Sequence, residues 1–168
     1  KEGINTKYIV WDTETPSGVA LIMVDNTGDN IICVAPGANA KLSPENVLTA
    51  EAAIKSADCV LLQLEIPLPT VEFAIRLASK YHVRVILNPA PMAKLSEDLL
   101  ARVDVFTPNE MEAAALSGNK VSHPRDLALI VTRKFNIKSV IITMGKEGAV
   151  ISGLTNSNPI EVPSFPVK

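Results

Sequence analysis

The sequence predicts an α/β fold, with a mostly parallel sheet flanked by helices and a small β-hairpin ahead of it. From residue 44 onward, short runs of β-branched residues alternate with segments of helical periodicity. The short runs are mostly apolar, as in strands that are covered on both faces. Such strands are joined by right-handed crossovers, so we expect helices on both faces of the sheet and a three-layer core.

The amino-terminal part predicts β structure alone. Residues 8–11 and 18–25 each have the composition of a strand, and residues 31–34 form a third. Between the last two lies Asn26-Thr27-Gly28-Asp29, which has the residues of a hairpin turn. One face of the hairpin carries Val19, Leu21 and Met23, and the other carries Ala20, Ile22 and Val24. Since both faces are apolar, we expect this flap to cover something with one face and to pack against a partner or the domain with the other.

The remaining elements alternate between helix and strand. Ser43 is the expected N-cap of the first helix, because Pro44 suits the first helical position and Glu45 the positive helix start. The predicted helices span residues 44–56, 70–81, 96–102, 110–116 and 125–135. The predicted strands span residues 59–64, 83–87, 103–106 and 139–143, followed by antiparallel edge strands at 148–152 and 160–163 around the polar turn 155–158. We therefore divide the chain into a flap, residues 8–40, and an α/β core, residues 41–168.

Composition limits the classes of partner. The chain has 168 residues, enough for one domain or part of one, with 16 Lys and Arg against 18 Asp and Glu. The sequence has no stripe of basic residues, which would predict nucleic-acid binding. It also has no apolar run long enough to predict a membrane helix. Cys33 and Cys59 lie in apolar runs, so we expect two buried free thiols. Free thiols favour a reducing, cytoplasmic setting.

Polar residues follow four of the predicted strands, at the edge where open α/β sheets bind ligands. These strand ends are Glu65, Asn88-Pro89-Ala90-Pro91, residues 107–112 and residues 143–148. The Glu65 carboxylate can accept hydrogen bonds from sugar hydroxyls, or it is a solvated acid at a turn. The Asn-Pro-Ala-Pro sequence is most simply a rigid stop to its strand. The glycines at 145 and 148 either let backbone amides approach a phosphate or an adenine, or form a hairpin turn.

The stretch Thr107-Pro108-Asn109-Glu110-Met111-Glu112 allows two interpretations. Pro108 ends the preceding strand, and Asn109 with Glu112 has the spacing of a capping box, which is a purely structural role. Alternatively, the same two side chains face a cleft and help to hold a nucleotide phosphate and its magnesium ion. Neither the P-loop spacing nor the dinucleotide-binding glycine pattern occurs in this chain.

Taken in order, several segments resemble the PfkB family of sugar kinases, and ribokinases in particular. The segments are Ser17-Gly18-Val19-Ala20 with Gly37-Ala38-Asn39-Ala40, Gln63-Leu64-Glu65, Asn88-Pro89-Ala90-Pro91, Thr107-Pro108-Asn109-Glu110 and residues 142–148. The resemblance implies a ribokinase-like, Rossmann-like core with a lid. It implies that Glu65 binds sugar hydroxyls and that Ala20 and Val34 are apolar lid residues that touch the sugar.

The resemblance also implies a nucleotide site. Asn109 and Glu112 match the Asn-x-x-Glu motif that organises the ATP phosphates and magnesium, with Glu112 acting through water. The nucleotide-holding loop matches Thr143, Met144, Gly145, Lys146, Glu147 and Gly148. The implied reaction transfers the γ-phosphoryl group of ATP to the 5-hydroxyl of ribose. In such a kinase Mg²⁺ and K⁺ are expected, and the lids pair across a homodimer.

Two family segments have no counterpart in this sequence. They are the amino-terminal sugar-binding stretches and the carboxyl-terminal Gly-Ala-Gly-Asp stretch, which carries the catalytic base. No residue here is therefore assigned as the base, and we expect this chain alone to be inactive. The alternatives are a non-catalytic nucleotide-binding, sugar-binding or dimerisation module, and a family kinase with another sugar or a nucleoside as acceptor.

Overall fold

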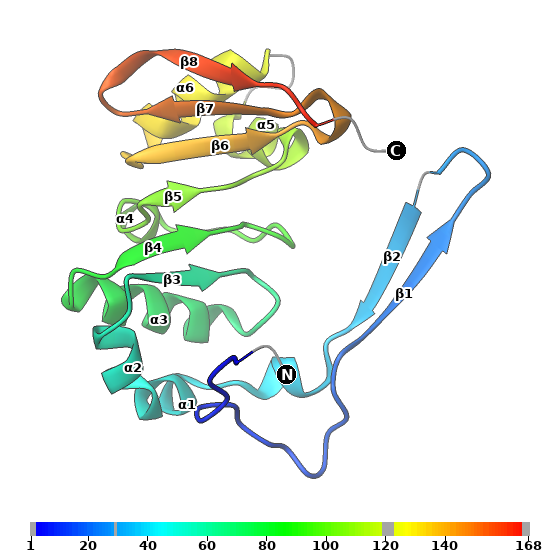
Figure 1. Cartoon of the computed structure of the whole chain (residues 1–168), viewed down its shortest axis with the longest axis vertical. Coiled ribbons are helices and arrows are strands. Elements are labelled where there is room, and N and C mark those ends of the chain that lie inside the picture. Colours follow the sequence, from blue (N-terminus) through cyan, green and yellow to red (C-terminus); the bar gives the residue numbers. More distant parts are fainter. Residues whose placement is uncertain (1–2, 29, 119–122, 166–168) are drawn as a thin grey trace.

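The computed structural model describes residues 3–28, 30–118 and 123–165, which form two sheets (Figure 1). The smaller sheet is an antiparallel hairpin of β1 (Val19–Val24) and β2 (Asn30–Ala35). The larger sheet has six strands in the order β3-β4-β5-β6-β7-β8. Strands β3 to β6 pair in parallel, and β7 and β8 add antiparallel pairs at one edge. The predicted α/β class and mostly parallel sheet are confirmed.

We call the part of the chain that follows the hairpin the body. Its helices and strands follow the predicted order. Its strands are β3 (Cys59–Leu62), β4 (Arg84–Leu87), β5 (Val105–Phe106), β6 (Ser139–Thr143), β7 (Ala149–Gly153) and β8 (Asn156–Val162). Its helices are α1 (Pro44–Thr49), α2 (Glu51–Lys55), α3 (Leu68–Lys80), α4 (Glu97–Leu100), α5 (Glu110–Ser117) and α6 (Pro124–Lys134). Two 3-10 turns, η1 (Gly37–Lys41) and η2 (Gly145–Glu147), complete the fold. Within the described residues, no helix combines the length and the apolar character that crossing a membrane requires.

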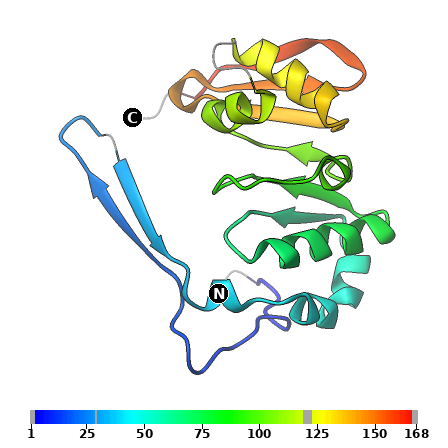
Figure 2. The same ribbon diagram turned by 180° about the vertical axis from the view of Figure 1, so that it is seen from behind.

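One face of the six-stranded sheet carries the core. Leu62, Leu87, Phe106 and Val140 lie side by side in consecutive strands, and the last three are fully buried. The helices α3, α5 and α6 lie on this face, as the two opposite views show (Figures 1 and 2). Burial of these rows removes apolar surface from water, which is the main force that holds helices and sheet together.

The other face of the sheet is apolar but uncovered. Leu61, Ile86 and Val105 form a cross-strand row on it, and Leu61 is 71% exposed. Helices on both faces were predicted, whereas the described residues place their helices on one face (Figure 2). The apolar character of the strands had predicted cover on both faces. The described residues supply that cover on one side, so they form two layers of the predicted three.

Three local predictions were wrong. Residues 8–11 form no strand, because no described segment pairs with their backbone; instead the Ile9 amide donates to the Thr6 carbonyl in a turn (3.1 Å). The predicted helix 44–56 is interrupted at Ala50 (ψ 9°), although neither glycine nor proline marks that position. Strand β8 begins at Asn156, so most of the predicted polar turn 155–158 belongs to a strand. Asp29, the last residue of the predicted hairpin turn, lies outside the described residues.

The cysteines are free, as predicted, but they are not buried. Cys33 and Cys59 are both exposed. Cys33 lies in the hairpin, where neither face is covered, and Cys59 begins strand β3 on the uncovered face of the sheet. The apolar runs around them had predicted burial. The difference is that a run of apolar residues is buried only where the fold brings another layer over it.

Candidate functional site

The hairpin stands beside the carboxyl ends of the parallel strands (Figures 1 and 2). A groove of about 670 Å³ separates the base of the hairpin from the loops that follow β3 and β4. Its walls are Ile32 and Val34 from the hairpin and Leu64, Ile66, Ala90 and Pro91 from the body, with Glu65 as the charged residue among them. An apolar groove with a few polar groups is the usual form of a small-molecule site.

The carboxylate of Glu65 is positioned by hydrogen bonds that extend the parallel ladder past its last strand residues. The Asn88 amide donates to the Leu62 carbonyl (2.9 Å), and the Leu64 amide donates to the Ala90 carbonyl (2.9 Å). The loops after β3 and β4 are thereby held together at the groove. Within the described residues the exposed Glu65 side chain has no hydrogen-bond or ion-pair partner. A carboxylate in this position can accept hydrogen bonds from hydroxyl groups of a ligand.

The two predicted lid residues share one face of the hairpin. Ala20 in β1 is the direct cross-strand partner of Val34 in β2, so their side chains lie next to each other. Val34 lines the groove, and Ile32, two residues earlier on the same face, lines it as well. Ile32 was missed as a site residue, although the two-residue period of a strand could have identified it.

The start of α5 is a capping box, as one of the two interpretations predicted. The Glu112 amide donates to Asn109 Oδ1 (2.8 Å), and the Asn109 amide donates to Glu112 Oε2 (2.8 Å). These bonds satisfy backbone groups that a helix start leaves unpaired. The second oxygen of Glu112, Oε1, has no partner among the described residues, so the capping role leaves it available.

The loop after β6 lies directly beside this helix start. Thr143 forms a parallel bridge with Asn109, and its amide donates to the Pro108 carbonyl (3.0 Å). The loop closes on itself through the Met144 amide, which donates to the Gly148 carbonyl (2.9 Å). A side chain at Gly148 (φ 101°) would come within 2.0 Å of the Val162 carbonyl, so glycine is required there. Gly145 (φ 55°) has open space around it, which leaves this side of the loop accessible.

The predicted site residues therefore form two groups along one edge of the sheet. Glu65, Val34 and Ala20 lie around the groove at β3 and the hairpin. Asn109, Glu112 and the loop Thr143, Met144, Gly145, Lys146, Glu147 and Gly148 lie together at β5 and β6. Strand β4 separates the two groups. The arrangement suits a ligand, or a pair of ligands, that extends across the strand ends.

The site suits a magnesium ion that takes most of its ligands from water and substrate phosphates. The described residues contain no group of three or more side chains that could hold a metal ion by themselves. Mg²⁺ characteristically keeps several waters and uses one or two carboxylates together with substrate phosphates. The free Oε1 of Glu112 matches that requirement, since it can accept a hydrogen bond from a metal-bound water.

A hairpin thus stands at the carboxyl ends of the parallel strands of an α/β sheet, with polar loops along those ends. The family model described as pfkB family carbohydrate kinase matches residues 1–168. The chain belongs to the pfkB family of carbohydrate kinases.

Two curated relatives illustrate the range of the family. The chain is 39% identical over 160 residues to a ribokinase of Staphylococcus aureus (strain COL), covering 94% of this chain and 53% of the relative. It is 38% identical over 169 residues to a deoxyribokinase of Salmonella typhi, covering 98% of this chain and 54% of the relative. The chain thus spans about half the length of the curated relatives it matches.

Solved structures agree with the fold. The structure described as "Crystal Structure of Sa239" matches with a TM-score of 0.87 at 38% identity, covering 98% of this chain and 55% of that one. The Arabidopsis thaliana ribokinase solved with ribose and ATP matches with a TM-score of 0.74 at 27% identity, covering 91% of this chain and 50% of that one. The predicted ribokinase-like architecture is confirmed.

Proposed function

We propose that this chain supplies the lid, the sugar-binding carboxylate and the nucleotide loop of an ATP-dependent ribokinase. The reaction is transfer of the γ-phosphoryl group from ATP to the 5-hydroxyl of D-ribose, which gives ribose 5-phosphate. The observation that carries the proposal is the unpartnered Glu65 carboxylate in an apolar groove beneath the lid hairpin. The relatives named as ribokinases support the choice of substrate.

In this proposal the sugar lies between hairpin and body. Glu65 accepts hydrogen bonds from ribose hydroxyls, and Val34 with Ala20 covers the apolar face of the sugar ring. A lid that closes over the groove excludes water, which strengthens electrostatic interactions inside the site and limits hydrolysis of ATP. Residues 8–40 are then the lid portion, and residues 41–168 are the binding core.

The nucleotide lies over the second group of residues. Asn109 and the loop Thr143 to Gly148 position the phosphates and the base, with backbone amides beside Gly145 open to the ligand. Glu112 holds a water of the magnesium ion, which supplies charge neutralisation at the phosphates when bound. Because phosphoryl transfer depends mainly on positioning and charge stabilisation, these residues orient the donor rather than take part covalently. A monovalent cation such as K⁺ is expected in the complete enzyme.

We further propose that the 168-residue chain alone does not catalyse phosphoryl transfer. None of its residues is assigned as the base that accepts the proton of the sugar hydroxyl. The uncovered sheet face with Leu61, Ile86 and Val105 supports the idea that further polypeptide completes the enzyme, since an apolar face of this kind favours cover.

The second candidate acceptor is 2-deoxyribose, because the chain is nearly as similar to the deoxyribokinase as to the ribokinase. Ribose and 2-deoxyribose differ by one hydroxyl. A site that hydrogen-bonds that hydroxyl discriminates strongly against the analogue that lacks it, because its polar group is then left unpaired. The ratio of kcat/KM for the two sugars therefore decides between the candidates.

The proposal is tested with a chimera in which this chain replaces the matching residues of the Staphylococcus aureus ribokinase. We expect the chimera to phosphorylate ribose with ATP and Mg²⁺, and the isolated chain to show no turnover. Glu65→Gln in the chimera is expected to raise KM for ribose by about 10- to 100-fold, since hydrogen bonds to charged groups are worth about 1.5–3 kcal/mol.

The matched control is Glu97→Gln, because Glu97 is exposed at the start of α4, away from the groove. It should leave KM unchanged. Turnover by the isolated chain would refute the proposed lack of a base. An unchanged KM for ribose in the Glu65→Gln chimera would refute the role of the groove.

The far face of the hairpin supports a homodimer. Val19, Leu21 and Met23 lie on the face opposite Ala20 and are exposed. We propose that two copies pair through their lids and bury this face, because exposed neighbouring apolar side chains favour association.

A further inference from the structure

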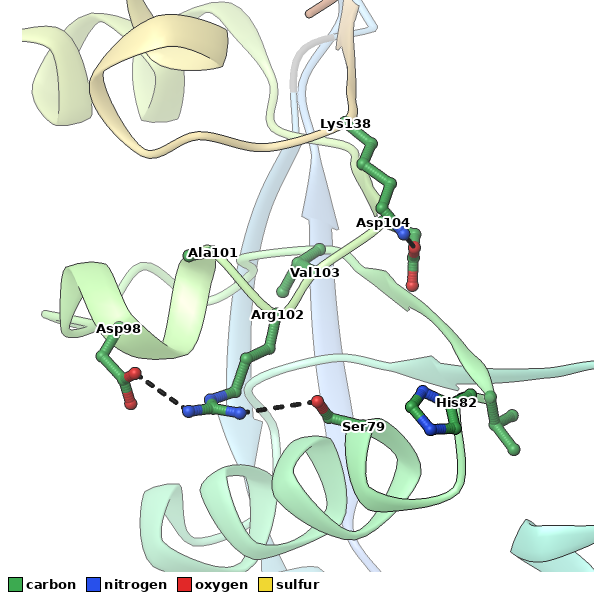
Figure 3. A pocket seen from close by; sticks show the side chains of 9 residues that line it. Ser79, His82, Asp98, Ala101, Arg102, Val103, Asp104 and Lys138 are labelled. Atoms are coloured by element: carbon green, nitrogen blue, oxygen red, sulfur yellow. Dashed lines mark hydrogen bonds and ion pairs between the residues drawn. The ribbon is translucent and has the colours of Figure 1, made fainter.

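A second cavity lies at the amino ends of the parallel strands, whereas the proposed kinase site lies at their carboxyl ends. It measures about 430 Å³ and is lined by residues of the connections that lead into β4, β5 and β6 (Figure 3). Its hydrogen-bonding and charged residues are Ser79, His82, Asp98, Arg102, Asp104 and Lys138. Nothing in the proposed sugar or nucleotide site uses any of them, so their arrangement needs a separate explanation.

The basic side chains of the cavity are paired with carboxylates. Arg102 Nη2 donates to Asp98 Oδ1 (3.0 Å), and Lys138 Nζ donates to Asp104 Oδ1. The second nitrogen of Arg102, Nη1, donates a long hydrogen bond to Ser79 Oγ (3.5 Å). Figure 3 shows these pairs around the hollow, with His82 beside Ser79. The Ser79 hydroxyl accepts that bond, and its own proton has no acceptor among the described residues.

Each carboxylate has a second partner that would remain if the basic side chain turned away. Asp98 Oδ2 also accepts from Arg76 Nη1 (2.9 Å), and Asp104 Oδ2 accepts from the Val85 amide (2.8 Å). The cluster therefore contains three cations, Arg76, Arg102 and Lys138, against two carboxylates. Arg76 lies outside the cavity lining, which itself carries two cations and two carboxylates, so one positive charge is in excess when Arg76 is counted with them. The side chains of Arg102 and Lys138 are 37% and 75% exposed, so packing does not enclose either of them.

His82 is held toward the cavity by an uncommon backbone conformation. It has a φ of 57° and follows the end of α3, where its amide donates to the Ser79 carbonyl and the Val83 amide donates to the Ala78 carbonyl. This is the pattern that ends helices with a left-handed residue, which is usually glycine. Histidine at this position adds an imidazole to the cavity wall, and the described residues offer that ring no hydrogen-bond partner.

We propose that this cavity binds the phosphate group of a small phosphorylated molecule or inorganic phosphate. Ser79 donates its hydroxyl proton, Arg102 donates from its guanidinium, His82 donates from its ring, and Lys138 turns from Asp104 to add charge. Charge-assisted hydrogen bonds of this kind are the strong ones, and arginine is suited to the geometry of phosphate. The site lies at the amino ends of the strands, so it does not rest on the proposed kinase function.

Histidine NMR tests the proposal directly, because the sequence has only 2 histidines. The imidazole signals of His82 and His123 are assigned with the variant His123→Gln, and sodium phosphate is then titrated at constant pH and ionic strength, with chloride as the balancing anion. We expect the His82 signal to shift along a saturating curve with a Kd of about 1 mM. Arg102→Gln and, separately, Lys138→Gln should each weaken that binding by about tenfold.

Arg133→Gln is the matched control, since Arg133 is exposed in the last turn of α6 and lies outside the cavity. In this variant the His82 signal should shift with added phosphate as it does in the unsubstituted protein. An unchanged His123 signal in each variant shows that the fold is intact, and two variants are used so that loss of fold in one leaves the other. A linear shift of both histidines, or saturation that survives both substitutions, would overturn the proposal.

Discussion

The two sheets of this molecule use apolar residues in opposite ways. In the six-stranded sheet, alternate residues are buried under helices, and Phe106, Val140 and Ile142 are fully inaccessible. In the hairpin, all six residues of β1 and all six of β2 are exposed, although most of them are apolar. A two-stranded hairpin is at best marginally stable by itself. The packed interior that stabilises this fold therefore lies in the six-stranded sheet and its helices, whereas both apolar faces of the hairpin are left exposed.

The largest expected effect is a loss of body stability. Phe106→Ala removes a fully buried ring and should lower the free energy of unfolding by about 3–5 kcal/mol, because a cavity remains where the ring packed. Denaturant unfolding followed by circular dichroism measures the change. The same substitution at Phe165, which is 88% exposed, should change stability by less than about 0.5 kcal/mol. Equal losses at the two positions would break the distinction between buried body and exposed regions.

A smaller effect separates the two roles of Glu112. Glu112→Ala removes half of the capping box and should lower the free energy of unfolding by about 1 kcal/mol. Glu112→Gln can still accept the bond from the Asn109 amide, so stability should be nearly retained. In the kinase chimera both substitutions should lower kcat with Mg-ATP. If Glu112→Gln kept full activity, capping alone would explain this residue.

Substitutions in the hairpin should affect function with little effect on stability. Leu21→Ser and Val34→Ser each change an exposed residue, so unfolding should shift by less than about 0.5 kcal/mol. Because they lie on opposite faces, they are controls for each other. Leu21→Ser should reduce self-association in sedimentation velocity, and Val34→Ser should raise KM for ribose in the chimera. A large loss of stability from either would show that the hairpin contributes to the core after all.

The smallest expected effect is an acid dependence at the surface of the body. Hydrogen bonds from Arg102 and then Arg76 lower the pKa of Asp98 below its usual value. A lowered folded-state pKa means that the pair contributes stability above the unfolded-state pKa and loses it as the pH falls through the folded-state pKa. Asp98→Asn should therefore lower the midpoint of thermal unfolding slightly at neutral pH and leave it unchanged in acid. Added salt should shrink the difference, because the pair is exposed.

The succession of helices and strands in the body follows from local sequence signals. Pro44 and Ser43 mark the start of α1, and Pro108 with Asn109 marks the change from β5 to α5, because their backbone and capping preferences act within a few residues. The break at Ala50 has no such signal. The strand predicted at residues 8–11 does not form, because a strand must pair with a neighbouring strand and the local sequence does not supply one.

The sequence by itself determined the order of the elements, the capping box and the four polar strand ends, because each depends on residues that are close along the chain. Only the tertiary structure decided what those residues meet. It brought Ile32 and Val34 of the hairpin to Glu65, placed Thr143 beside Asn109, and left Cys33, Cys59 and the row at Leu61 uncovered. Burial and proximity arise from segments far apart in sequence, so they depend on which layer packs over which face.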